Sequence, residues 1–226
     1  LSTVVNTNSP NLYPPSSLLN RIIKAATREY DGDSTRCELD SHADTCVGGS
    51  NFLPFGDSKR TVNVYAFSED YGAHTYPITS MATVWTSPID GQPYLLIVNE
   101  GIYCGDSVRH SLLTPNQLRA NGIIVDDCPK QFDKSSSHSL SIPSQELTIP
   151  LELSGVISSF VTHKPTQEEL HSLPTVELTS DMTWDPSSAH FAEAEASISA
   201  IRSMAYAPDA DTRAIAALHR IDNPPL

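Results

Sequence analysis

The sequence predicts a mostly β fold, and three observations support this class. The 226 residues include 17 prolines, and each proline removes a backbone donor and fixes φ, which disfavours a mostly helical chain. Between residues 33 and 128, apolar side chains recur in short runs with the two-residue period of strands. Polar segments rich in glycine, aspartate and proline separate these runs, as expected for turns.

Two β-hairpins are expected in this region, because strand-like runs occur in pairs around short turns. The four runs are 61–67, 73–79, 80–87 and 93–101. The first turn is the sequence SEDYG, with Gly72 near its tip. The second turn contains Asp90-Gly91, which is a strong hairpin signal.

One short helix is predicted after the hairpins, within residues 110–122. Thr114 is placed as its N-cap, Pro115 at the first helical position and Gly122 at its end, positions that these residue types favour. A last strand follows in the sequence IIVDD. We therefore expect a compact β domain over residues 33–128.

The N-terminal flank, residues 1–32, is predicted to be a proline-rich linker followed by a helix. Its serine-capped stretch 16–30 carries apolar residues at helical spacing. The first residues lack the basic segment and compact apolar run of a secretory signal. The cysteines are therefore expected to be reduced thiols, and Cys37 to be a small apolar residue of the core.

The C-terminal flank is expected to be less regular than the β domain. Residues 129–166 are predicted to form a loop with one or two extra strands. Residues 167–226 are predicted to be an acidic, partly disordered spacer with a helix over 188–206, because 151–226 contain 4 Lys/Arg and 11 Asp/Glu. Trp184 is expected to dock this tail.

Charge and hydropathy exclude two classes of function. The formal charge of −13 repels phosphate backbones, so no direct nucleic-acid binding is expected. No run approaches eighteen consecutive apolar residues, so no membrane association is expected.

The sequence LDSHADT, residues 39–45, combines two aspartates with hydroxyl side chains. Hydrolysis of a peptide by water needs one group that deprotonates the water and another that protonates the carbonyl oxygen. Two carboxylates that share one proton do both, because like charges about 3 Å apart cannot both ionise. A one-domain enzyme of this kind supplies one aspartate per chain and completes the pair by two-fold dimerisation.

The segment resembles the protease region of Ty1/copia-type retrotransposon gag-pol polyproteins, which is of the retropepsin-like class. The resemblance rests on LDSHADT, on the hairpins that follow it and on SLLTPNQLRANGIIVDD (111–127), and it covers roughly residues 33–185. It implies a single-lobe β-barrel with a flap hairpin, acting as a homodimeric aspartic endopeptidase without metal or cofactor. The substrate would be the polyprotein itself, in cytoplasmic virus-like particles.

The resemblance also assigns roles to individual residues. Asp40 matches the catalytic aspartate, Ser41 the hydroxyl that braces the loop across the dimer, and Leu113 an apolar position below the site. The other active-site loop and flap residues are His42, Ala43, Asp44, Thr45, Asp70, Tyr71 and Gly72. His42 and Arg109 stand where the family has glycine.

Three other interpretations are open at this point. The carboxylates of Asp40 and Asp44 could accept backbone N–H bonds in an ordinary turn, with His42 at the surface. The domain could also be a catalytically inactive spacer or assembly module, which His42 and Arg109 favour. A zinc site could use Cys37, His42 and Cys46, completed by Cys104 and His110.

Overall fold

The computed structural model describes residues 34–56, 59–65, 73–189 and 191. The chain divides into two compact units, residues 1–184 and 185–226, and every element below belongs to the first. The helix expected at 16–30 and the flap tip at 70–72 lie outside the described residues. Nearly all of the helix expected at 188–206 does so as well.

The described part of the chain is mostly β, as predicted, and one sheet contains ten strands. These are β1 (Thr35–Leu39), β2 (Val47–Gly49), β3 (Leu53–Phe55), β4 (Thr61–Tyr65), β5 (Ala73–Thr86), β6 (Pro93–Gly105), β7 (Ser111–Leu113), β11 (Glu152–Ser154), β12 (Ile157–Thr162) and β13 (Thr175–Glu177). Their order is β11-β12-β1-β7-β2-β6-β5-β3, with β13 paired to β6 and β4 paired to β5. The expected closed barrel is not formed by the described residues, because the short end strands β11 and β3 pair with one neighbour each.

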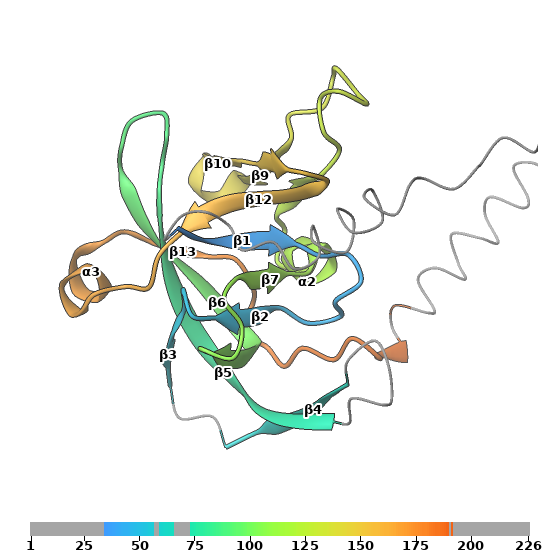
Figure 1. The fold of residues 1–226 in the computed structure, drawn as a ribbon, viewed down its shortest axis with the longest axis vertical. Coiled ribbons are helices and arrows are strands. Elements are labelled where there is room, and N and C mark those ends of the chain that lie inside the picture. Colours follow the sequence, from blue (N-terminus) through green and yellow to red (C-terminus); the bar gives the residue numbers. More distant parts are fainter. Residues whose placement is uncertain (1–33, 57–58, 66–72, 190, 192–226) are drawn as a thin grey trace, which may run out of the picture. The chain divides into compact units, whose positions relative to one another are not determined.

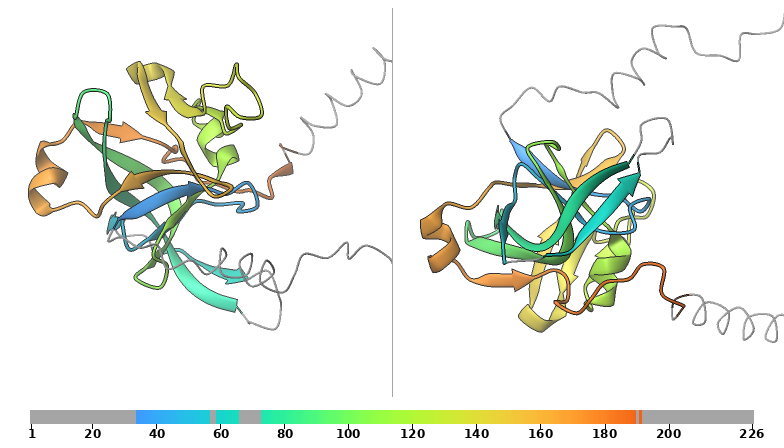
Figure 2. Two further views of the ribbon diagram at one scale, coloured as in Figure 1. Left: turned by 45° about the horizontal axis from the view of Figure 1, so that its top comes forward. Right: turned by 90° about the horizontal axis from the view of Figure 1, so that it is seen from below.

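Both predicted hairpins are confirmed, and β5 belongs to each of them. Its first half pairs antiparallel with β4 and its second half with β6. The register shifts between Thr79 and Met81, and β5 is mainly buried only from this point onward. Figures 1 and 2 show β5 curving away from the main sheet, so that the β4–β5 hairpin extends from it.

Apolar side chains are buried in two clusters, because successive residues of a strand point to opposite faces of the sheet. Ala82, Val84 and Leu95 form the smaller cluster, and the main hydrophobic core contains Met81 and Trp85. Cys37 is fully buried in it, as predicted. Trp85 and Tyr94 lie opposite each other in the β5–β6 ladder and stack with their ring centroids 5.8 Å apart. The aromatic residues of these runs therefore serve packing.

The predicted short helix is α2 (Pro115–Ala120). Thr114 occupies the N-cap position without a side-chain hydrogen bond, and Gly122 follows the helix with φ +79°, a conformation that glycine adopts at little cost. The expected strand IIVDD is β8 (Ile124–Asp126). β8 lies beside α2 and belongs to a separate three-stranded sheet (Figure 1).

This second sheet joins β8 to two strands from residues 129–166, where a loop with one or two extra strands is expected. It has the order β10-β9-β8, formed with β9 (Ser139–Ile142) and β10 (Leu147–Pro150), and a 3-10 turn, η2 (Pro143–Gln145), joins the two later strands. Leu140 and Ile149 are fully buried. The serine-rich composition concealed β9, because only its alternate residues are apolar.

The expectation that the chain becomes loose from residue 167 is wrong for residues 167–179. The helix α3 (Gln167–Ser172) begins with a capping box between Thr166 and Glu169. β13 then pairs parallel with β6, and its Val176 is fully buried. The expected domain boundary at 128 also differs from the structure, because β12 pairs with β1 along four residues.

Candidate functional site

Asp40 directly follows β1, at the point where β1 runs parallel to β7. Leu39 pairs with Leu113 in this ladder, and the backbone N–H of Asp40 donates a 3.1 Å hydrogen bond to the Leu113 oxygen. The bond continues the ladder one residue beyond the strand. Asp40 is therefore held by main-chain contacts, while the residue stays partly exposed at the surface.

The loop after Asp40 makes a tight turn, which the carboxylate of Asp40 stabilises. Asp40 Oδ1 accepts a 2.8 Å hydrogen bond from the backbone N–H of His42. Ser41, His42 and Asp44 are exposed, so the expected surface position of His42 is confirmed. The ordinary-turn interpretation holds for the Asp40 carboxylate, and Asp44 engages the fold through its backbone oxygen instead.

Cys46 anchors the far end of the loop through three hydrogen bonds. Its N–H donates to Gln117 Oε1 (2.9 Å), its carbonyl accepts from the N–H of Ile102 (2.9 Å), and its sulfur accepts from the N–H of Thr114 (3.3 Å). Gln117 and Thr114 belong to the start of α2, and both are buried. The short helix therefore supports the loop from below.

A chain of buried polar groups runs beneath the loop and joins β2, β7 and β12. The N–H of Gly49 donates to Ser111 Oγ (2.8 Å), Ser111 Oγ donates to Asn51 Oδ1 (2.6 Å), and Asn51 Nδ2 donates to Thr162 Oγ1 (2.6 Å). Each of these side chains is buried. Satisfied networks of this kind rigidify a core because an unpaired buried group is costly.

Glu100 connects the site to the base of the β4–β5 hairpin, and no sequence pattern singled it out. Arg60, just before β4, donates to both Glu100 carboxylate oxygens at 3.1 and 2.8 Å. Glu100 Oε2 also accepts from the backbone N–H of Trp184 at 3.2 Å. The indole Nε1 of Trp184 donates to the backbone oxygen of Asp44 at 2.9 Å, so Trp184 docks on the loop that follows Asp40.

The described residues contain no group of three or more His, Cys, Asp or Glu side chains arranged to hold a metal ion. Cys37 and Cys46 lie in the core, and burial raises the pKa of each thiol to about 12. His42 is exposed on the loop instead of facing them. The suggested zinc site is therefore not formed.

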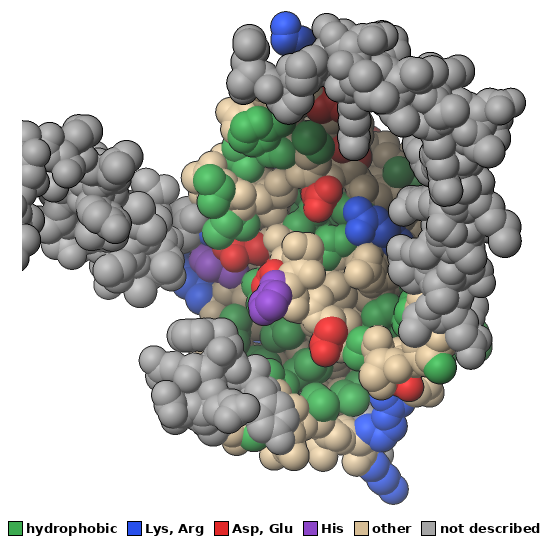
Figure 3. Space-filling view, turned by 90° about the vertical axis from the view of Figure 1, so that its right-hand side faces the viewer, with side chains coloured by type: hydrophobic (Ala, Val, Ile, Leu, Met, Phe, Trp, Pro, Cys, Tyr) green, Lys and Arg blue, Asp and Glu red, His purple; other side chains and the backbone are tan. Residues whose placement is uncertain are grey.

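The β1–β2 loop reaches the right-hand side of the molecule in Figure 1. Figure 3 views this side, where acidic and histidine side chains lie among hydrophobic surface.

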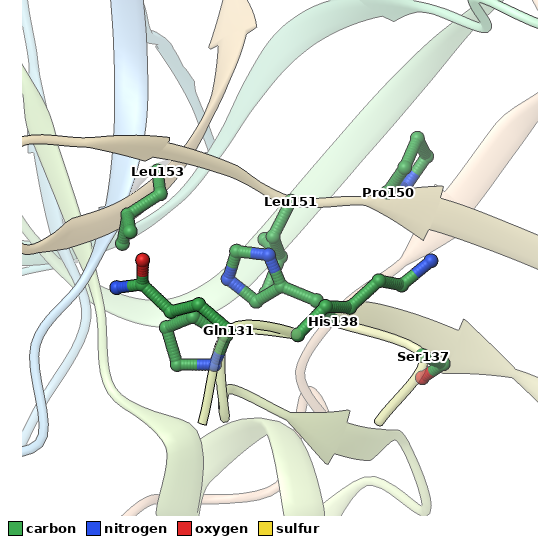
Figure 4. Close-up of a pocket in the computed structure, with 8 residues that line it drawn as sticks. Gln131, Ser137, His138, Pro150, Leu151 and Leu153 are labelled. Carbon is green, nitrogen blue, oxygen red and sulfur yellow. The ribbon is translucent and has the colours of Figure 1, made fainter. Parts of the chain in front are cut away.

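A separate cavity of about 300 Å³ lies between the loop before β9 and the β10–β11 connection. Figure 4 shows the His138 ring near Gln131 and Leu151, and a ring nitrogen of His138 is 2.9 Å from Ser158 Oγ. None of the lining residues belongs to the Asp40 loop. The cavity contributes nothing to the candidate site.

Comparisons of the chain with protein-family models, with curated proteins and with solved structures found no match. None of the helices in the described ranges has the length and apolar character needed to cross a bilayer.

Proposed function

We propose that this chain is the aspartic endopeptidase segment of a copia-like retrotransposon polyprotein, with a retropepsin-like fold. The observation that carries this function is the placement of Asp40. Its backbone is fixed by the parallel β1–β7 contact to Leu113, and the residue stays partly exposed at the head of a tight loop. A catalytic carboxylate needs this combination of a rigid backbone and access to substrate.

Catalysis would require the Asp40 carboxylates of two protomers to meet at a two-fold axis and share one proton. The ionised carboxylate takes a proton from water while the oxygen of that water attacks the peptide carbonyl carbon. The protonated carboxyl gives its proton to the carbonyl oxygen, which produces a neutral tetrahedral diol. Ser41, exposed beside Asp40, braces the loop against the partner protomer.

The substrate would be an extended segment of the polyprotein, held as an added strand beneath the β4–β5 hairpin. Among the described strands, β4 pairs with β5 alone, which leaves its second edge open to a peptide. The first half of β5 is largely exposed, as expected for a hairpin that extends over a cleft. No metal or cofactor takes part, and the site of action would be a cytoplasmic virus-like particle.

Self-processing tests this function. The chain is expressed with its natural neighbouring segments as wild type, as Asp40→Asn and as Asp44→Asn, and fragments are followed from pH 4 to 7. We expect cleavage by the wild type and its loss in Asp40→Asn, because the amide cannot hold the shared proton. Asp44→Asn tests the loop's other carboxylate and leaves the backbone contact to Trp184 intact.

An inactive β module is the second candidate, favoured by the Asp40–His42 bond, which an ordinary turn would also make. A folded dimer that leaves the polyprotein intact at every pH would establish this alternative. In that case, His42→Gly would show whether the histidine is what blocks cleavage.

A further inference from the structure

The segment after β13 is tied to β6 before it reaches the active-site loop. The N–H of Leu178 donates to the Ile97 oxygen at 2.8 Å. Thr179 then exchanges three hydrogen bonds with Asn99, at 2.7, 3.1 and 2.8 Å. Both residues of this pair are buried, so the segment leaves the core from a rigid point.

Trp184, five residues further on, contacts two separate parts of the site. Its indole N–H holds the backbone oxygen of Asp44, and its backbone N–H holds the carboxylate of Glu100. The indole bond holds the active-site loop between its two anchored ends, Asp40 and Cys46, and closer to Cys46. Because Trp184 contacts a backbone oxygen, the hydrogen bond constrains the backbone of the loop and does not depend on the Asp44 side chain.

Glu100 links Trp184 to the β4–β5 hairpin. Its carboxylate forms a bidentate pair with Arg60, and the Arg60 oxygen accepts the N–H of Ile78 in β5 at 3.0 Å. Glu100 itself has φ +53°, a left-handed conformation that is uncommon for a residue other than glycine and is kept only where the surroundings favour it. Its backbone oxygen also accepts from Gln117, which anchors Cys46.

We propose that Trp184 and Glu100 are positioning residues that couple the active-site loop to the base of the flap hairpin. This coupling rests on the proposed protease function and adds a requirement to it. The active chain must retain the segment through Trp184, although the motif-bearing region ends near residue 128. A maturation cut placed before Trp184 would release the loop and inactivate the enzyme, whereas a cut after it would not.

Hydrogen–deuterium exchange tests the coupling in the full-length chain, with Trp184→Phe and Glu100→Gln as variants. Trp184→Phe keeps an aromatic ring and the backbone bond but removes the indole donor. We expect peptides over 41–46 to exchange about fivefold faster, the factor that corresponds to loss of one hydrogen bond. Glu100→Gln, which weakens the pair with Arg60, should accelerate exchange over both 41–46 and 61–65.

Gln145→Ala is the matched control, because Gln145 Nε2 donates to the Thr175 oxygen on the same segment but outside the coupling. It should leave 41–46 unchanged. Unaltered exchange over 41–46 in Trp184→Phe, or an equal rise in Gln145→Ala, would overturn the coupling. If Trp184→Phe does not fold, Glu100→Gln tests the coupling alone. Faster exchange over both 41–46 and 61–65 would support it, and faster exchange over 61–65 without 41–46 would overturn it.

The two ideas fail separately. If Trp184→Phe accelerates exchange of the loop but no cleavage depends on Asp40, the coupling stands without the protease function. If cleavage depends on Asp40 but exchange is unchanged, the protease function stands without the coupling. In an active enzyme, Trp184→Phe should lower kcat more than it raises KM, because the loop holds the reacting carboxylate and not the distant parts of the peptide.

Discussion

The backbone oxygen of Leu113 accepts the N–H of Asp40, so a residue just before α2 fixes the first residue of the loop between β1 and β2. The two residues lie at the carboxyl ends of parallel strands. A contact of this kind cannot come from a local turn, because parallel strands need a long connection between them. The hairpins and the crossing segments between β1 and β7 supply that connection and thereby position the loop.

Asn51→Ala should lower the free energy of unfolding by about 2–4 kcal/mol, because it leaves the buried hydroxyls of Ser111 and Thr162 without their amide partner. Urea unfolding monitored by circular dichroism measures the change. Asn63→Ala is the control, since Asn63 is exposed and its side chain accepts a hydrogen bond from the exposed Thr75, and its effect should stay within about 0.5 kcal/mol. Equal losses in the two variants would show that the buried network adds no stability.

Gly49→Ala should destabilise the protein by about 2–3 kcal/mol through overpacking. A Cβ at this position would collide with the backbone oxygens of Val108 and His110, which cannot move aside as a side chain can. Gly122→Ala offers a comparison, because nothing lies near its Cβ and only its positive φ opposes alanine, at about 1 kcal/mol. Chemical denaturation measures the free energy of unfolding of both variants. A larger loss of stability in Gly122→Ala than in Gly49→Ala would contradict this prediction.

The Asp126 carboxylate should make the free energy of unfolding depend on pH in the acidic range. Hydrogen bonds from the Ser136 hydroxyl and from the backbone and hydroxyl of Ser137 lower its pKa from 3.8 to about 2. A carboxyl whose folded pKa is depressed stabilises the protein above its unfolded pKa, and the contribution is lost as pH falls from about 4 to 2. Wild type should therefore exceed Asp126→Asn in urea midpoint at pH 6, and the gap should narrow toward pH 2.

Asp127→Asn serves as the control for this pH series, because the neighbouring side chain is exposed. Its difference from wild type should stay nearly constant between pH 6 and pH 2. A gap for Asp126→Asn that is equally constant would show that the serine hydrogen bonds do not shift the titration of this carboxyl.

The four thiols should react at different rates with an alkylating reagent at pH 8. Cys37 and Cys46 are fully buried with pKa values raised to about 12, and burial raises the pKa of Cys104 to about 11. The half-buried Cys104 and Cys128 should therefore label before the two core thiols, which should react only after unfolding. Peptide mass spectrometry follows the order, and early labelling of Cys37 would contradict its placement in the core.

Sequence patterns predicted the elements that depend on nearby residues. The Asp90-Gly91 turn, the paired strand runs and the Thr114-Pro115 start of α2 each act over a few residues, so periodicity and turn chemistry sufficed. The Thr166–Glu169 capping box carried an equally local signal for α3. The acidic composition of the surrounding segment favours disorder and conceals this local signal.

The contacts that complete the site could not be predicted in the same way. Val176 is a single buried residue between two exposed ones, which is too little pattern to indicate a strand that pairs with β6. Glu100 and Arg60 belong to different hairpins, and nothing in their local sequence indicates a bidentate pair. Among these contacts, the docking of Trp184 alone was indicated by the sequence, because Trp184 is a single large aromatic residue in a polar segment.

The sequence by itself determined the mostly β class, the two hairpins, the short helix and the loop that carries Asp40, because periodicity and turn residues act locally. The tertiary structure decided what surrounds that loop: the parallel contact to Leu113, the support from Gln117 and the link from Trp184 through Glu100 to Arg60. These contacts join residues far apart in the chain. Their geometry follows from which strands pair within the sheet, and composition and spacing do not encode that pairing.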